Sequence, residues 1–334
     1  MKERISWIDM AKGHGTLLVI YAHLGVDSLW SWMYSFHLPL FFFLSGYVFH
    51  GQKGFSDFIR KKCKAILVPY FCLGIPMVLF QLLKYIYTGR LSGQAAVQLV
   101  KDYLLQERFW TLWYLACLFC LNLLFYIIVK ACRHEWLIAL ISIIMPVLGL
   151  YYYRQGGQPL PWNVDACAMA IPFFYAGYCY QRYGQNTKER VGRKIFAPVL
   201  FVIFAGLNLL CWQMSLDETG LGLEMFESNY GNPIFTYIAA FAGIACVLLV
   251  SKALVIPPIK YIGENSMLYY AWHQTIFIPI VQKVLGKVGI VYPVEGSLLE
   301  ITFYKMLCLI VIVGLISVCN WMIKKFKWMW IVGK

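Results

Sequence analysis

Ten apolar runs follow one another along the chain, separated by breaks rich in polar residues, proline and glycine. Most runs approach the roughly 20 residues that an α-helix needs to cross a bilayer. The pattern therefore predicts an all-α, polytopic transmembrane bundle of about ten spanning helices. We expect one integral membrane domain over residues 1–334, without a soluble domain. The expected helices cover residues 13–30, 36–50, 65–88, 109–130, 136–153, 165–181, 196–213, 232–251, 266–283 and 301–323.

Composition supports the membrane class. The chain is 60% hydrophobic and 13% charged, whereas soluble domains are about 45–50% apolar and about 25% charged. We therefore expect the lipid bilayer to be its surroundings. Of the eleven cysteines, Cys117 and Cys120 form a C-x-x-C inside an apolar run with no second pair. We interpret them as packing residues and expect no metal site.

The distribution of charge predicts the topology. A net charge of +13 could indicate a nucleic-acid partner, but the lysines and arginines lie in short clusters between the apolar runs. With a cytoplasmic N-terminus, inside segments carry about three times as many basic residues as outside segments, as the positive-inside rule requires. We therefore expect no nucleic-acid partner, a multi-pass protein of the inner (cytoplasmic) cell membrane, both termini in the cytoplasm, and residues 216–232 outside.

The first run contains ionisable groups that a membrane penalises. In DMAKGHGTLLVIYAHLG (residues 9–25), a charge at mid-membrane would cost about 2.5–3.5 kcal/mol, so each such group is a functional candidate. Eleven residues are close to three helical turns, which places Lys12 and His23 on one stripe about 16 Å apart. Asp9 lies near that stripe and His14 on the opposite face. The alternative is a buried histidine satisfied by a neighbouring helix.

Other polar or aromatic residues stand out within or beside the runs, and each has a structural alternative. The basic cluster in FIRKKCKAILVPY could be an ordinary positive-inside anchor. The acid and the histidines could be hydrogen-bonded packing groups, and the tryptophan part of an interfacial aromatic belt. These further candidates are His37, Ser45, Arg60, Lys61, Lys64, Trp113, Asp165 and His273.

Taken in order, these motifs resemble the acyltransferase-3 family, membrane enzymes that O-acetylate bacterial surface sugars and include fucose 4-O-acetylase-like and exopolysaccharide acetyltransferases. RISWIDMAKG, with Arg4, Asp9 and Lys12, resembles the family's opening motif, and Lys12 with His23 its basic-residue, ten-residue-gap, histidine signature. HLPLFFFLSGYVF, KKCKAILVPY, LWYL and IGENSMLYYAWH resemble its later segments. Lysines stand at 12, 61 and 64 where many members carry arginine, so point charges replace bidentate phosphate contacts.

The resemblance implies acetyl transfer from cytoplasmic acetyl-CoA to a hydroxyl of a cell-surface or lipid-linked sugar, as in polysaccharide biosynthesis. It implies His23 as general base or transient acyl carrier, with Asp9 and Lys12 as the other catalytic-site residues. CoA phosphates would meet Lys12, Arg4, Arg60, Lys61 and Lys64. The candidate substrate-binding residues are His37, Ser45, Trp113, Asp165 and His273.

Several points stay open in the sequence. A proton-coupled transporter or flippase of a glycan or small metabolite is the alternative function, since intramembrane ionisable groups also line transport paths. The acceptor sugar, the choice between acetyl and another short acyl group, and a homo-oligomeric state are also open.

Overall fold

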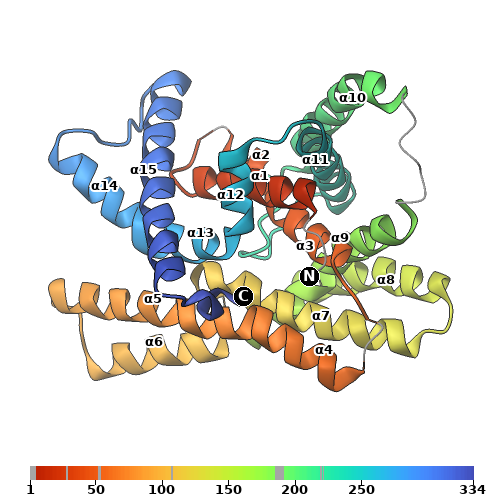
Figure 1. Ribbon diagram of the computed structural model, residues 1–334, viewed down its shortest axis with the longest axis horizontal. Coiled ribbons are helices and arrows are strands. Elements are labelled where there is room, and N and C mark those ends of the chain that lie inside the picture. The colour runs from red at the N-terminus through yellow and green to blue at the C-terminus, as the bar shows by residue number, and fades with distance from the viewer. Residues whose placement is uncertain are drawn as a thin grey trace. The chain divides into compact units, whose positions relative to one another are not determined.

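The computed structural model describes residues 5–27, 29–51, 54–106, 108–184, 192–218, 220 and 222–334. Within these ranges the secondary structure is helical, apart from one antiparallel bridge between Glu224 and Asn229 (Figure 1). The predicted all-α class is therefore confirmed. Arg4, one of the candidate donor-binding residues, lies outside the described residues.

Six helical stretches in the described part of the chain are long and apolar enough to cross a membrane, which makes this a multi-pass membrane protein. The predicted count of ten spans is not reached by this measure. The runs 13–30, 36–50, 165–181 and 266–283 contain helices too, but these are shorter, less apolar or interrupted. The six stretches are Phe55–Tyr87, Gly93–Ala131, Glu135–Arg154, Phe196–Ser215, Pro233–Ala253 and Leu298–Lys325.

The predicted bounds of the first helix are wrong. The run suggested 13–30, whereas α1 spans Ser6–Ala22 and His23 is its C-cap. Residues 6–12 are helical, but they include Asp9 and Lys12, so a pattern based on apolar residues leaves them out of the predicted helix. The chain then turns at Gly25, whose φ of 142° favours glycine, and a short helix α2 (Trp30–Tyr34) follows. His23 thus ends a helix instead of lying within one.

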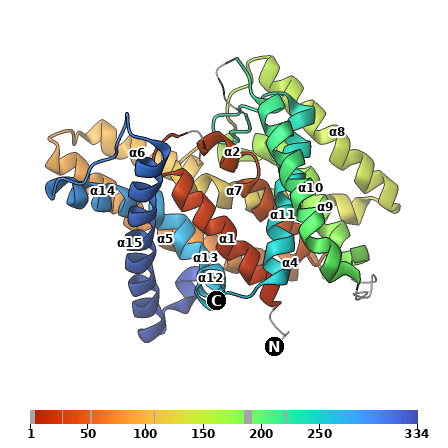
Figure 2. The same cartoon turned by 90° about the horizontal axis from the view of Figure 1, so that it is seen from above.

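Contacts along the chain divide it into two compact units. The first contains residues 1–49 and 170–266. Helix α1 packs against α3, α11 and α12, while α10 and α11 lie side by side (Figure 2). Its helices are α1, α2, α3 (His37–Tyr47), most of α9 (Val164–Tyr183), α10 (Gly192–Ser215), α11 (Pro233–Ala253) and α12 (Pro257–Glu264).

Glycines allow α1 and α12 to touch through their backbones. A Cβ on Gly263 would lie 1.7 Å from the carbonyl oxygen of Asp9, and one on Gly13 would lie 2.1 Å from the carbonyl oxygen of Ile259. No side chain fits at either crossing point. Small residues bring membrane helices together in this way. The IGENS segment therefore holds the helix that carries Asp9, Lys12 and His23.

The second unit contains residues 50–169 and 267–334. Two five-residue π-turns interrupt its helices, and each precedes a proline, Pro69 or Pro279. Proline lacks the N–H that an α-helix needs at that point, and a wider turn accommodates the loss. Its main helices are α4 (Phe55–Lys62), α5 (Val68–Tyr87), α6 (Gly93–Leu105), α7 (Trp113–Ala131), α8 (Glu135–Arg154), α13 (Ser266–Trp272), α14 (Ile278–Lys287) and α15 (Leu298–Lys325), and its π-turns are η1 (Cys63–Leu67) and η5 (His273–Phe277).

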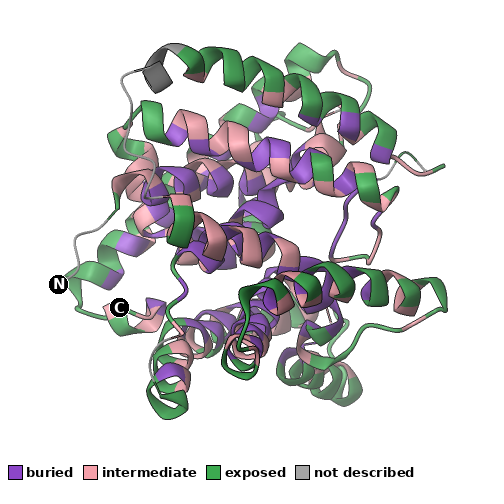
Figure 3. Ribbon diagram, turned by 90° about the vertical axis from the view of Figure 1, so that its right-hand side faces the viewer, coloured by how far each residue is buried: buried purple, intermediate pink, exposed green. Residues whose placement is uncertain are grey.

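The long helices present apolar residues outward. Figure 3 shows exposed positions along them, and on α10 these include Phe196, Val202 and Leu210, each more than 60% exposed. In water such a surface would be a liability, but hydrocarbon is as apolar as these side chains. The outward apolar faces therefore support the membrane assignment independently of helix length.

The predicted topology can be tested by cysteine labelling in a background without the eleven native cysteines. Glu227 is exposed in the segment predicted to lie outside, and Lys327 is exposed near the C-terminus predicted to lie inside. We expect an impermeant maleimide added to intact cells to label Glu227→Cys, and to label Lys327→Cys only after permeabilisation. The reverse pattern would overturn the topology.

The α1–α12 crossing predicts a position-specific cost. Gly263→Ala must push the two backbones apart, so it should destabilise the protein by about 1–3 kcal/mol, the usual cost of overpacking. Gly206 on α10 has no atom within 4 Å of an added Cβ, so Gly206→Ala should be neutral or stabilise by about 0.5–1 kcal/mol. Thermal unfolding in one detergent measures both, and equal melting temperatures would contradict the crossing.

Candidate functional site

His23 is held with one defined ring nitrogen available as a base. Its Nδ1 lies 2.7 Å from the carbonyl oxygen of Val19, one turn back on α1. Because a carbonyl can only accept, Nδ1 carries the proton and Nε2 keeps its lone pair. The Tyr34 hydroxyl lies 3.2 Å from that Nε2 and donates to it. The arrangement gives a neutral imidazole whose basic nitrogen faces a hydroxyl.

Tyr34 lies between two histidines of the first unit. Its ring centroid is 5.7 Å from that of His23 and 4.7 Å from that of His37, which it meets edge-on. Burial, and secondly the Glu224 carboxylate, raise the pKa of the Tyr34 hydroxyl above its ordinary value, so this hydroxyl stays a donor. His37 is 1% exposed and its Nδ1 lies 2.7 Å from the carbonyl oxygen of Met33. Its buried Nε2 has no hydrogen-bond partner among the described residues.

Asp9, Lys12 and His14 lie on α1, the helix that His23 caps. Asp9 is buried and Lys12 half-buried, and the three-residue separation keeps them on adjacent positions of one face. His14 points elsewhere, because its Nδ1 lies 3.0 Å from the Ser251 hydroxyl of α11. Ser45, half-buried in α3, belongs to the same unit.

The basic cluster lies in the second unit. Arg60 and Lys61 are in the last turn of α4, and Lys64 is in the π-turn that follows. All three side chains are exposed, so the surface offers cations to an anion in solution. π-turns occur often at functional sites, and this one places Lys64 three positions from Lys61.

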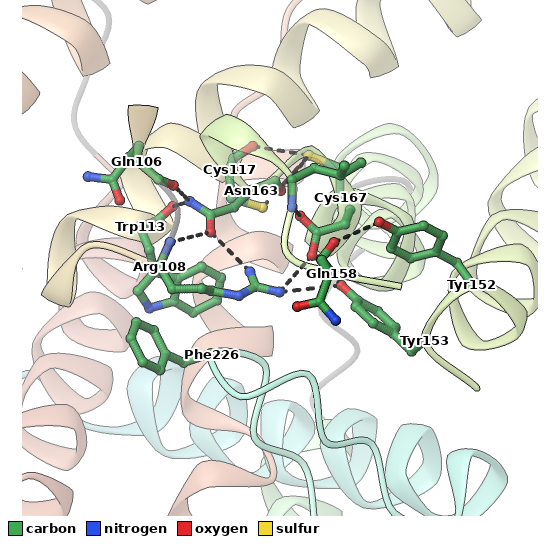
Figure 4. A network of polar contacts seen from close by, with 12 residues as sticks. Gln106, Arg108, Trp113, Cys117, Tyr152, Tyr153, Gln158, Asn163, Cys167 and Phe226 are labelled. Atoms are coloured by element: carbon green, nitrogen blue, oxygen red, sulfur yellow. Dashed lines mark hydrogen bonds and ion pairs between the residues drawn. The ribbon is translucent and has the colours of Figure 1, made fainter. Parts of the chain in front are cut away.

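Asp165 and Trp113 join a polar network of the second unit through Arg108. Figure 4 shows Arg108, Trp113, Tyr153 and Asn163 of this network. The Asp165 carboxylate accepts from the Arg108 guanidinium at 2.6 Å, the Tyr153 hydroxyl at 2.5 Å and the Leu160 N–H at 3.1 Å. The Arg108 guanidinium lies over the Trp113 ring, 5.8 Å from its centroid. Burying two charges is favourable only when both find such partners. The geometry favours a positioning role for Asp165 over direct contact with a substrate.

Asn163 ties this network to the chain before α7. Its side chain accepts from the Arg108 guanidinium at 3.0 Å and donates to the Gln106 carbonyl at 2.8 Å. His273, fully buried at the start of η5, repeats the pattern of His23, since its Nδ1 donates to the carbonyls of Tyr269 and Tyr270 at 3.0 and 2.8 Å.

Sequence reasoning missed Tyr34 and Arg108. Tyr34 precedes His37 by three residues in a segment too short to register as a run. Its contact with His23 depends on the turn at Gly25, which the apolar pattern cannot show. Arg108 lies between two apolar runs, where the sequence shows it only as one basic residue of a loop. Its partner Asp165 is 57 residues away, and no local spacing links the two.

The comparison with known protein families agrees with the motifs. The model of the acyltransferase domain matches residues 5–323, nearly the whole chain. No curated protein and no solved structure matches. The match includes α1 with His23, the basic cluster, the Arg108 network and most of α15. The chain is therefore a membrane enzyme that moves an acyl group from a donor to an acceptor, and it belongs to the acyltransferase-3 family.

Proposed function

We propose that this enzyme transfers an acetyl group from cytoplasmic acetyl-CoA to a hydroxyl of a cell-surface or lipid-linked sugar, with His23 as general base. The observation that carries the proposal is the hydrogen bond from His23 Nδ1 to the Val19 carbonyl. It fixes the tautomer and leaves Nε2 as the proton acceptor. The Tyr34 hydroxyl at 3.2 Å satisfies Nε2 in this structure, so a substrate hydroxyl would have to take its place.

The reaction requires one proton to move. A sugar hydroxyl is a weak nucleophile until a base takes its proton during attack on the thioester carbonyl. The Tyr34 hydroxyl at 3.2 Å marks the position before Nε2 that a sugar hydroxyl would occupy. As the oxygen bonds to the acetyl carbon, its proton passes to Nε2. The carbon–sulfur bond then breaks, and the proton goes on to the CoA sulfur.

Cations at two places are proposed to serve the donor. CoA carries phosphates, and lysine ammonium groups bind these as point charges. Arg60, Lys61 and Lys64 are exposed on α4 and η1, on the side predicted to be cytoplasmic. Lys12, about 16 Å along α1 from His23, adds a cation in the first unit. Asp9, one turn away, steadies that lysine.

Transport is the weaker alternative. The same intramembrane groups could carry protons with a substrate, but membership in the acyltransferase family favours a chemical step over transport. Purified enzyme separates the two: acetyl transfer from acetyl-CoA in detergent needs no membrane gradient, whereas transport does.

His23→Ala should lower acetyl transfer by about 10²–10⁴-fold, the usual contribution of a positioned general base. His23→Gln should fail as badly, because an amide keeps a hydrogen bond but cannot accept the proton. Transfer from radiolabelled acetyl-CoA by detergent-purified protein measures both, with size-exclusion chromatography to establish folding.

His14→Ala is the matched control. It removes a histidine from the same helix whose ring pairs with Ser251, so activity should stay within a fewfold of wild type. Near-normal transfer by His23→Gln would reduce His23 to a structural role and refute the catalytic assignment.

Changing both Lys61 and Lys64 to alanine should raise the KM for acetyl-CoA roughly tenfold, since an exposed charge contact contributes about 0.5–1 kcal/mol. The KM should also depend less on ionic strength, because screening acts on these contacts. Initial rates at two salt concentrations provide the measurement.

The control for this pair changes Lys324 and Lys325 to alanine, removing two basic residues from the last turn of α15 on the same predicted side. If both double variants shift KM and salt dependence equally, the cluster acts only through net charge and does not bind the donor.

A further inference from the structure

A cavity in the second unit has no role in the proposed mechanism. It has a volume of about 290 Å³ and lies between α5, α6 and the loop that leads to η2 (Trp110–Leu112). Sites for small molecules begin near 300 Å³, so this one suits a single sugar-sized ring. The residues that matter in its lining are Tyr85, Gln98, Asp102, Arg108, Phe109 and Trp110.

The lining combines aromatic faces with planar polar groups. The rings of Phe109 and Trp110 lie side by side, 4.3 Å between centroids, and Tyr85 adds a third ring. Gln98 donates to the Asp102 carboxylate at 2.6 Å, so an amide and a carboxylate stand together at the same cavity. A pyranose has an apolar C–H face and a rim of hydroxyls that both donate and accept. Aromatic rings suit the face, and the amide–carboxylate pair suits the rim.

The charge of the cavity excludes the donor. Arg108 is neutralised by Asp165 at 2.6 Å, so its cation is already paired. Asp102 then leaves the lining with a carboxylate that would repel the phosphates of CoA or an acidic sugar. Among the sugar rings of surface glycans, an uncharged one therefore suits this lining better than an acidic one.

The loop beside the cavity is strained, and the strain is held in place. Gln106, Arg108 and Trp110 have φ of 56°, 56° and 43°, the left-handed region that residues other than glycine adopt at a cost of about 1–3 kcal/mol each. Trp162 and Asn163, at 59° and 54°, face them through the Asn163 hydrogen bonds to Gln106 and Arg108. Five of the seven such residues described thus gather at one place. Strain of this kind collects at ligand sites, and here it turns Arg108 and Trp110 toward the cavity.

We propose that this cavity binds an uncharged sugar ring of the acyl acceptor, with Trp110 stacking on the ring and Gln98 and Asp102 hydrogen-bonding its hydroxyls. The proposal rests on the sugar acetyltransferase activity proposed above. Arg108, Asn163 and Asp165 are positioning residues that hold the strained loop. The segment lies between the runs 65–88 and 109–130, on the side that the alternation of spans predicts to be outside.

The test titrates an acceptor against purified enzyme. The probe is the glycan fraction extracted from cells that lack this chain, with radiolabelled acetyl-CoA as donor. Gln98→Ala and Asp102→Asn should each raise the KM for the extract about five- to tenfold, as the loss of one hydrogen bond does, and Trp110→Ala by at least as much. None should raise the KM for acetyl-CoA in step.

Gln94→Ala and Trp136→Ala are the matched controls. Gln94 lies one turn before Gln98 on α6, and Trp136 is 62% exposed on α8. Both are outside the lining, so both should keep the wild-type KM for the extract. An unchanged KM in all three lining variants, or a parallel rise in the KM for acetyl-CoA, would overturn the acceptor site. Failure of the proposed function has a different signature, because wild-type enzyme would then move no label into the extract.

Discussion

The constraint on which this structure depends is that a polar group buried away from water must find a partner inside the protein. Its clearest expression is the bond from a histidine Nδ1 to a carbonyl one turn back, made by His23, His37 and His273. The backbone carbonyl satisfies the N–H of each ring and fixes its tautomer without any second side chain. In His23 the other nitrogen, Nε2, then faces the Tyr34 hydroxyl. The same hydrogen bond that satisfies the buried ring N–H also leaves the lone pair on Nε2, the nitrogen that a base needs.

The same constraint shapes the second unit differently. There a full charge is buried, and one partner is not enough. Arg108 reaches Asn163, Asp165 and Tyr153, and the Asp165 carboxylate accepts from three donors. Such a network stabilises only when complete, so the loop must follow the positions of its partners, even into the left-handed region. The positive φ angles of this loop therefore accompany the hydrogen bonds that satisfy the Arg108 guanidinium. The same hydrogen bonds hold the side of the cavity that Arg108 lines.

The sequence predicted what depends on local periodicity. Period and composition predicted the all-α class, and each of the ten runs contains a helix. Lys12 lies on α1, and His23 is the C-cap of the same helix. Local patterns could not predict the start of α1 in polar residues, the turn at Gly25, or α6, whose 13 residues are too few to span. Arg108 with Asp165, and Tyr34 with His23, come together through tertiary packing, which single-helix spacing does not encode.

The polar first helix is tolerated because neighbouring helices bury much of it. A helix of 17 residues is short for a span, and α1 is buried along much of its length, including Asp9 at 3% exposure. Helices α3, α11 and α12 pack around it, and Gly13 and Gly263 let α12 approach to backbone contact. The ionisable groups of α1 are therefore surrounded by protein and not by hydrocarbon. Carbonyls and hydroxyls of that protein can form hydrogen bonds with them and offset the free-energy cost of burial. An apolar α1 would bury as well, but it could not present a base to a hydroxyl. The surrounding helices keep the polar groups of α1 away from hydrocarbon.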